Sequence, residues 1–190
     1  MYNQRLAQHE DRENKAEQEY NTQSQERCKE RKQLLNALID GKDVTLMQKE
    51  LLRVPDRMSL SFPYHIEPVL NGTDIDISLT LPQTKDLPNF EGVRLASGNY
   101  KIKEIPNKDM KCDYSNWVWS IAIYVAGHYF NISPQICKVS IEGHVKTEDS
   151  NDLSLYTVSF NRETYSSLNF EDLEIDAALS RFTTTNMMTK

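Results

Sequence analysis

The first 40 residues carry few hydrophobic positions. They contain no Gly or Pro and are rich in Gln, Glu, Lys and Arg, which favour a helix. The best seam at a 4-3 spacing is apolar only at Tyr2, Leu6, Ala16, Tyr20 and Leu34. This pattern predicts a long polar helix, which would extend roughly 60 Å at about 1.5 Å per residue. The seam is too polar for a strong homodimeric coiled coil, so the helix is either solvated or completed by a partner.

A helical hairpin is predicted at the end of this tract. Its first apolar stripe precedes Gly41, a natural helix stop, and consists of Leu34, Leu35, Leu38 and Ile39. Residues Thr45 to Gln48 match a capping box, which opens a second helix that ends near Arg53. The side chains expected to pack on the first stripe are Leu46, Met47, Leu51 and Leu52. The segment LLNALIDGKDVTLMQKELL, residues 34–52, resembles the SHOCT module, and that resemblance implies oligomerisation.

A β-hairpin is predicted around Asn71 and Gly72, a pair that favours a two-residue turn. In the strand that follows, the polar residues alternate with apolar ones, which are Ile75, Ile77, Leu79 and Leu81. A turn at Asn71 and Gly72 makes Leu70 face Thr73. The same register makes Glu67 face Asp76.

The remaining pattern predicts one long buried helix among short strands. Residues 107–131 carry two apolar stripes, so this helix is expected to be buried on more than one side. We expect a loop at 82–99, strands at 100–105, 139–145 and 155–160, and a last helix at 175–182. The prediction is an α+β fold: a mixed or antiparallel sheet of about 4–5 strands packed on a long central helix, preceded by the long polar helix. We divide the chain into a helical region, 1–54, and an α+β domain, 55–190.

The second half of the chain resembles an uncharacterised bacterial domain over roughly residues 64–182. The segments that carry the resemblance are YSNWVWSIAIYVAGHYFNISPQICKVSIEGHV and SLYTVSFNRETYSSLNFEDLEIDAALSRF. The similar domain joins a helix that ends at a proline to two strands and an acidic terminal helix. The resemblance implies a bacterial, intracellular origin and carries no known activity.

The charge and the cysteine content indicate which classes of partner and which cellular compartment to expect. From Gly41 onward the chain has 15 basic and 20 acidic residues, so neither nucleic acid nor an anionic membrane is an expected partner. The three cysteines, Cys28, Cys112 and Cys137, are widely spaced and form no CxxC pair. This spacing fits neither a disulfide framework nor a zinc ribbon and indicates a reducing compartment. No stretch is apolar enough for a signal peptide or a membrane span, so we expect a soluble, cytoplasmic protein.

One acidic cluster follows from the expected hairpin register. Glu67 would face Asp76, with Asp74 on the same polar face, and these carboxylates would suit Mg²⁺, Mn²⁺ or Ca²⁺. One alternative function is therefore a divalent-metal-dependent hydrolase or nuclease-like enzyme that uses Glu67, Asp74 and Asp76. The other interpretation is an ordinary solvated sheet face with Lys101 or Lys103 as its counter-charge.

No other motif predicts catalysis or a cofactor. The chain lacks Gly-rich nucleotide loops, a GxSxG elbow and an HExxH helix. Cys137 and His144 would lie roughly 23 Å apart on one strand, and Cys112 and His128 about 24 Å apart on one helix, too far for a Cys–His dyad. A pairing of Cys112 or Cys137 with His65 or His128 across the fold stays open, but no pattern favours it, and we expect both cysteines to be buried and structural. We therefore expect a non-enzymatic protein-interaction or assembly module without a cofactor. Its N-terminal helix would bind a protein partner or a second copy through Tyr2, Leu6, Ala16, Tyr20 and Leu34.

Overall fold

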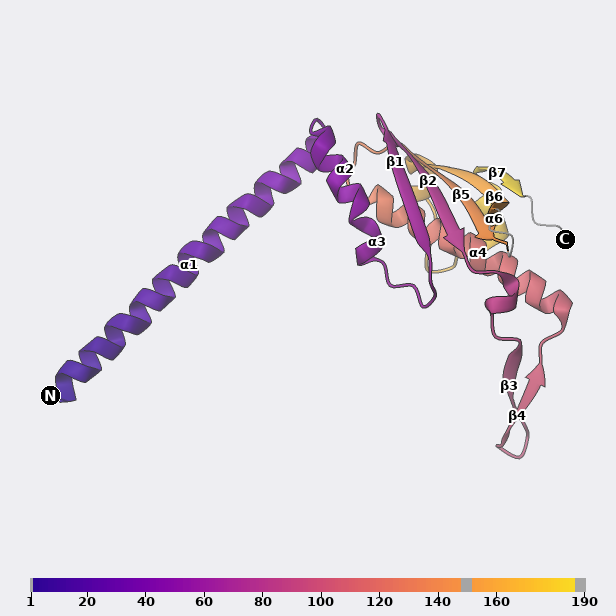
Figure 1. Cartoon of the computed structure of the whole chain (residues 1–190), viewed down its shortest axis with the longest axis horizontal. Coiled ribbons are helices and arrows are strands. Elements are labelled where there is room, and N and C mark those ends of the chain that lie inside the picture. The colour runs from indigo at the N-terminus through magenta and orange to yellow at the C-terminus, as the bar shows by residue number, and fades with distance from the viewer. Residues whose placement is uncertain (1, 148–151, 187–190) are drawn as a thin grey trace.

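The computed structural model describes residues 2–147 and 152–186, and for residues 2–11, 13, 14 and 186 it describes the backbone only. Its elements form the predicted α+β fold, with a mixed five-stranded sheet, a long central helix and a long N-terminal helix. In Figure 1, helix α1 (Tyr2–Asp40) leads away from the rest of the chain, whereas the central helix lies against the sheet. None of the helices in this part of the chain is long and apolar enough to cross a membrane.

The five-stranded sheet is mixed because its two halves meet in a parallel pair. Its strands are β1 (His65–Asn71), β2 (Asp74–Leu81), β5 (Lys138–Lys146), β6 (Asp152–Asn161) and β7 (Thr183–Asn186). They lie in the order β1-β2-β5-β6-β7, with β2 parallel to β5 and the other neighbours antiparallel. A parallel pair needs a long crossover. Helix α4 (Asn107–Phe130) lies within this crossover and covers one face of the sheet (Figure 1).

Burial follows the strand alternation and both apolar stripes of α4. Ile77, Ile141 and Val158 form one inward row across β2, β5 and β6, and all three are almost completely buried. The buried residues of α4 are Tyr114, Val118, Trp119, Ile121, Ala122, Ile123, Val125, Ala126, Tyr129 and Phe130. The helix is therefore buried on more than one side, as predicted: against the sheet, and against α5 (Arg162–Ser166) and the segment after it.

The β1–β2 turn lies one residue later than predicted. Gly72 and Thr73 form the turn, Gly72 has φ of +67°, and Asn71 pairs with Asp74. Each residue of β1 therefore faces a residue two positions further along β2 than predicted. Because side chains in a strand alternate with a period of two, each one keeps its predicted face while its partner changes.

The helical hairpin forms, but its cap and its packing differ from the prediction. Helices α2 (Val44–Leu52) and α3 (Val54–Arg57) follow α1. Asp43 caps α2 by accepting the Leu46 amide at 2.9 Å, so the capping box predicted from Thr45 is wrong. Of the two expected stripes, Leu38, Met47 and Leu51 join the core of the α+β domain. Packing is wrongly predicted for four residues that remain 39–66% exposed: Leu34, Leu35, Ile39 and Leu52.

Three further elements differ from the prediction. Residues 82–99 are not all loop, because they hold a short 3₁₀ helix, η1 (Thr84–Asp86), and strand β3 (Phe90–Arg94). β3 pairs with β4 (Tyr100–Glu104) in a separate two-stranded sheet that projects from the body (Figure 1). The last helix, α6 (Ile175–Leu179), is shorter than predicted, and β7 follows it.

Candidate functional site

The predicted partner-binding residues lie along α1, and those whose side chains are described are not covered by the rest of the described chain. The side chains of Tyr2 and Leu6 lie outside the described part of the chain. Tyr20 is 71% exposed, Leu34 is 39% exposed, and Ala16 is exposed as well. Every residue from 15 to 36 is exposed, so this stretch of α1 does not pack against the described part of the domain.

The last turn of α1 is held by the connection between α4 and β5. The Ser133 hydroxyl donates a hydrogen bond to the Leu38 carbonyl at 2.5 Å, and the Gln135 side-chain amide donates to the Ile39 carbonyl at 3.1 Å. Carbonyls in the last turn of a helix have no intrahelical donor, so these bonds satisfy them. Gly41 has φ of +65°, and a Cβ there would lie 2.6 Å from the Gln135 Cγ atom. Glycine therefore both ends α1 and admits the connection.

The predicted metal ligands are not gathered into one cluster. Glu67 faces Ser78 rather than Asp76, so the predicted direct pairing is wrong. The Asp74 carboxylate lies 2.7 Å from the Lys138 ammonium group on β5. A metal site would need three or more His, Cys, Asp or Glu side chains close together. The side chains described within residues 2–147 and 152–186 contain no such group.

Other neighbours also hold the two remaining carboxylates. The Asn71 side-chain amide donates to Asp76 at 2.6 Å, and a ring nitrogen of His65 lies 3.0 Å from Glu67. Lys101 and Lys103, the predicted counter-charges, lie on β4 in the separate two-stranded sheet. The polar face of β1 and β2 is thus organised by local pairs.

The three cysteines are free and exposed, so the prediction that Cys112 and Cys137 are buried is wrong. Cys28 lies on α1, Cys112 on α4, and Cys137 immediately before β5. Sequence spacing alone cannot reveal burial, because it does not show which face of an element meets the core. Cys28 gives α1 a natural attachment point for probes.

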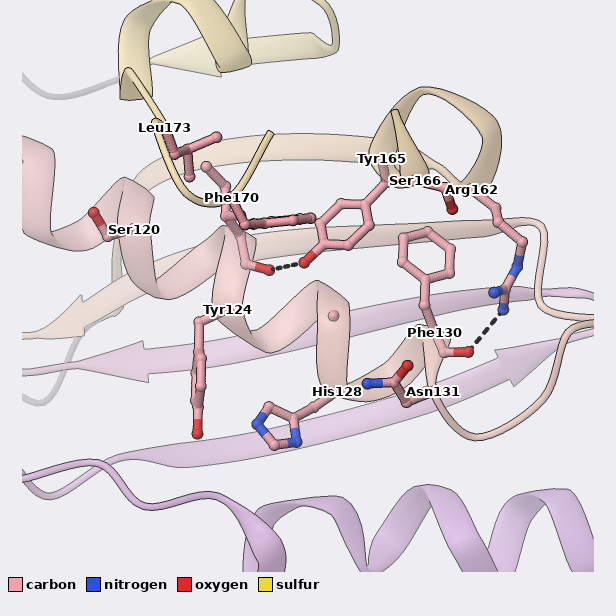
Figure 2. Close-up of a pocket in the computed structure, with 12 residues that line it drawn as sticks. Ser120, Tyr124, His128, Phe130, Asn131, Arg162, Tyr165, Ser166, Phe170 and Leu173 are labelled. Atoms are coloured by element: carbon pink, nitrogen blue, oxygen red, sulfur yellow. Dashed lines mark hydrogen bonds between the residues drawn. The ribbon is translucent and has the colours of Figure 1, made fainter. Parts of the chain in front are cut away.

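A groove that sequence reasoning missed lies between α4 and the segment from α5 to Leu173. Its volume is about 550 Å³, within the range of small-molecule sites. Figure 2 shows Tyr165 and Phe170 on one side of α4, and Tyr124 and His128 projecting from its other side. The lining comes from residues 120–131 and 162–173, two segments that sequence patterns do not bring together.

One wall of the groove depends on a close approach to Gly127. The Tyr165 hydroxyl donates to the Ile123 carbonyl at 2.8 Å, as drawn in Figure 2. A Cβ at Gly127 would lie 2.5 Å from the Tyr165 hydroxyl oxygen, so only glycine leaves room for this bond. The Phe170 ring lies 5.4 Å from that of Tyr165 and is 53% exposed. This wall is therefore aromatic and partly open to solvent.

Arg162 provides the positive charge of the groove, but backbone oxygens bind much of its guanidinium group. Its Nη2 atom donates to the carbonyls of Phe130 at 2.8 Å and Ser133 at 2.5 Å, and its Nε atom donates to that of Ile136 at 2.5 Å. The guanidinium carbon also lies 4.9 Å from the centre of the Phe130 ring. These contacts fix the end of α4 and the connection after it, so the primary role of Arg162 is structural.

His128 is the titratable base that lines the groove. Its ring packs edge-on against Tyr124 at 4.5 Å, and partial burial lowers the pKa of the imidazole below its usual value. None of the described residues that line the groove is Asp, Glu or Cys. This lining suits contact with an apolar or aromatic group and offers no carboxylate or thiol for covalent chemistry.

The chain matches no protein-family model, no curated protein and no solved structure. The resemblances of residues 34–52 and 64–182 stated above therefore stay predictions, and the account of function depends on the geometry of this chain.

Proposed function

We propose that this chain is a non-enzymatic protein-interaction or assembly module whose α1 arm, residues 2–34, engages a protein partner or a second copy. The observation that carries the proposal is that α1 meets the body at its last turn, while residues 15–36 are exposed. A helix in water gains most of its stability from packing a face against something else. Over residues 15–34 the arm packs no such face against the described domain, so a partner would supply it.

Apolar side chains near the elbow between α1 and α2 extend this surface. Leu35 and Ile39 lie one helical turn apart on α1 and are 49% and 52% exposed. Val44 and Leu52 lie two turns apart on α2 and are 56% and 66% exposed. An exposed group of large apolar residues next to a polar arm is typical of an interaction site.

The anchoring of α1 favours a binding role over that of a loose tail. Two side-chain hydrogen bonds, a buried Leu38 and a glycine stop fix the direction in which the arm leaves the body. A fixed direction lowers the entropy that is lost when a partner binds.

The test compares the full chain with a chain that lacks residues 1–34. This deletion keeps Leu38 and both hydrogen bonds of the last turn, so the domain should stay folded. We expect the deletion to lower the number of copies per particle, obtained from light scattering. Alternatively, it should remove cross-linked species that the full chain forms in native cell extract. The proposal fails if both forms have the same stoichiometry and the same cross-linked partners.

A further inference from the structure

The β3–β4 hairpin projects as an isolated two-stranded sheet from the end of the body that lies away from α1 (Figure 1). All residues of both strands are exposed. A hairpin on its own is at most marginally stable in water, because two strands bury little apolar surface. Such a hairpin gains stability when one of its faces is covered.

The strand register divides the hairpin into two unlike faces. Residues that pair directly share a face, which gives one face, here named the aromatic face, made of Phe90, Gly92, Arg94, Tyr100, Ile102 and Glu104. On this face Phe90 is 56% exposed, Tyr100 72% and Ile102 75%. Tyr100 leans over Gly92, where a Cβ would lie 4.0 Å from its ring.

The opposite face is suited to water. It carries Val93 and Lys101, together with Glu91 and Lys103, whose charged atoms lie 3.9 Å apart. The hairpin is thus amphipathic, with a charged side and an apolar side that the described part of the chain leaves open.

The aromatic face has opposite charges at its two ends. Arg94 and Tyr100 pair near the tip, Gly92 and Ile102 pair in the middle, and Phe90 and Glu104 pair at the base. Neither Arg94 nor Glu104 forms an ion pair with another described side chain. A face with a positive tip, an apolar middle and a negative base is complementary to itself when one copy is reversed.

We propose that the aromatic face binds the same face of a second copy, with the two hairpins stacked and their tips pointing in opposite directions. This arrangement places Arg94 of one copy against the Phe90–Glu104 pair of the other. Ile102 then packs on its own counterpart near the twofold axis, as a self-complementary interface requires. The hairpin is distinct from the α1 arm, so this inference stands or falls independently of the proposed function.

The interface is small, and the dimer is accordingly weak. Two five-residue strands cover less than the ~1,200 Å² of a standard stable interface. We expect a dissociation constant on the order of micromolar to millimolar. The relevant measurements therefore need high protein concentration or covalent trapping.

The first test traps the contact in the full chain. Cys28, Cys112 and Cys137 are exposed and are replaced by Ser, after which Ile102→Cys places a thiol at the proposed axis. A short bis-maleimide that spans the ~10 Å between stacked sheets should link two copies. The matched control is Lys101→Cys, one residue away on the opposite face, which should give little dimer.

The second test exchanges the charges. Arg94→Glu and Glu104→Arg should each weaken the dimer about tenfold in sedimentation equilibrium, since each creates two like-charge contacts. An equimolar mixture of the two variants should restore association, because every contact between unlike copies again joins opposite charges. The fully exposed hairpin tolerates these changes, and an unchanged circular dichroism melt checks that the domain remains folded.

Three results would overturn the inference: equal trapping at positions 101 and 102, no trapping at 102, or no rescue when the variants are mixed. A chain that stays monomeric but sediments with anionic lipid vesicles through Tyr100 and Ile102 would overturn it too. That outcome would assign the aromatic face to a membrane surface.

Discussion

The Ser133 hydroxyl donates a hydrogen bond to the carbonyl oxygen of Leu38 at 2.5 Å, joining residues 95 positions apart in the sequence. Both residues are buried, Ser133 at 2% and Leu38 at 8% exposure. This bond links the end of the α1 arm to the connection that follows the central helix. Together with the bond from Gln135 to the Ile39 carbonyl, it couples the direction of the arm to the α4–β5 connection.

Replacing Ser133 by Ala should destabilise the protein by about 1–2 kcal/mol, because the buried Leu38 carbonyl loses its side-chain donor. Urea denaturation followed by circular dichroism measures this change. Ser120→Ala is the matched control, since the exposed Ser120 hydroxyl bonds only to the Asn116 carbonyl one turn earlier in α4. Equal stability of the two variants would contradict the proposed anchoring role of Ser133.

The wall of the groove can be tested with Gly127→Ala. The added methyl group would meet the Tyr165 hydroxyl at 2.5 Å, so Tyr165 must move and lose its bond to the Ile123 carbonyl. We expect a loss of about 1–3 kcal/mol in the free energy of unfolding. In a Tyr165→Phe background the same substitution should cost less, because the clashing oxygen is gone. If the double-mutant cycle gives no coupling energy between the two substitutions, the Tyr165 hydroxyl is not what excludes a side chain at position 127.

Stability should fall as the pH drops through the titration range of His128. Burial lowers the pKa of the folded-state imidazole from its ordinary value of 6.5. Below about pH 6.5 the unfolded chain binds this proton while the folded chain resists it, so acid favours unfolding. Between about pH 8 and pH 5, the free energy of unfolding should change less with pH for His128→Gln than for the original chain. Parallel pH profiles would contradict this assignment.

Divalent cations should not change the melting temperature. Asp74 is paired with Lys138, Asp76 accepts from Asn71, and Glu67 lies beside His65. We expect the same melting curve in Mg²⁺, in Mn²⁺ and in EDTA. A cation bound at 100 times its dissociation constant would add about 2.7 kcal/mol, and such a shift would revive the hydrolase or nuclease-like alternative.

Periodicity predicted the elements whose apolar positions repeat strongly. The alternation of Ile75, Ile77, Leu79 and Leu81 marks β2, and the double stripe of residues 107–131 marks α4. Both patterns reflect burial, because buried positions are apolar and repeat with the period of the strand or helix. The α+β class followed from the order of these elements.

Features that depend on contacts between separate segments of the chain could not be predicted from periodicity. A two-residue shift of the β1–β2 register keeps every side chain on its face, so alternation cannot distinguish the two registers. The strand β7 reads TTTN and forms by pairing with β6 rather than by burying apolar side chains. The groove and the Ser133–Leu38 bond each join segments far apart in the chain, and local pattern carries no record of such contacts.

Site-specific photo-crosslinking would show whether α1 contacts a protein partner. A photoreactive phenylalanine analogue would replace Tyr20 in the full chain, with Gln18 as the control site, because two residues rotate the helix by about 200° to its other side. We expect a discrete cross-linked product from position 20 in native cells, with much less from position 18. Absence of a product at position 20, or equal products from both sites, would contradict the proposed contact.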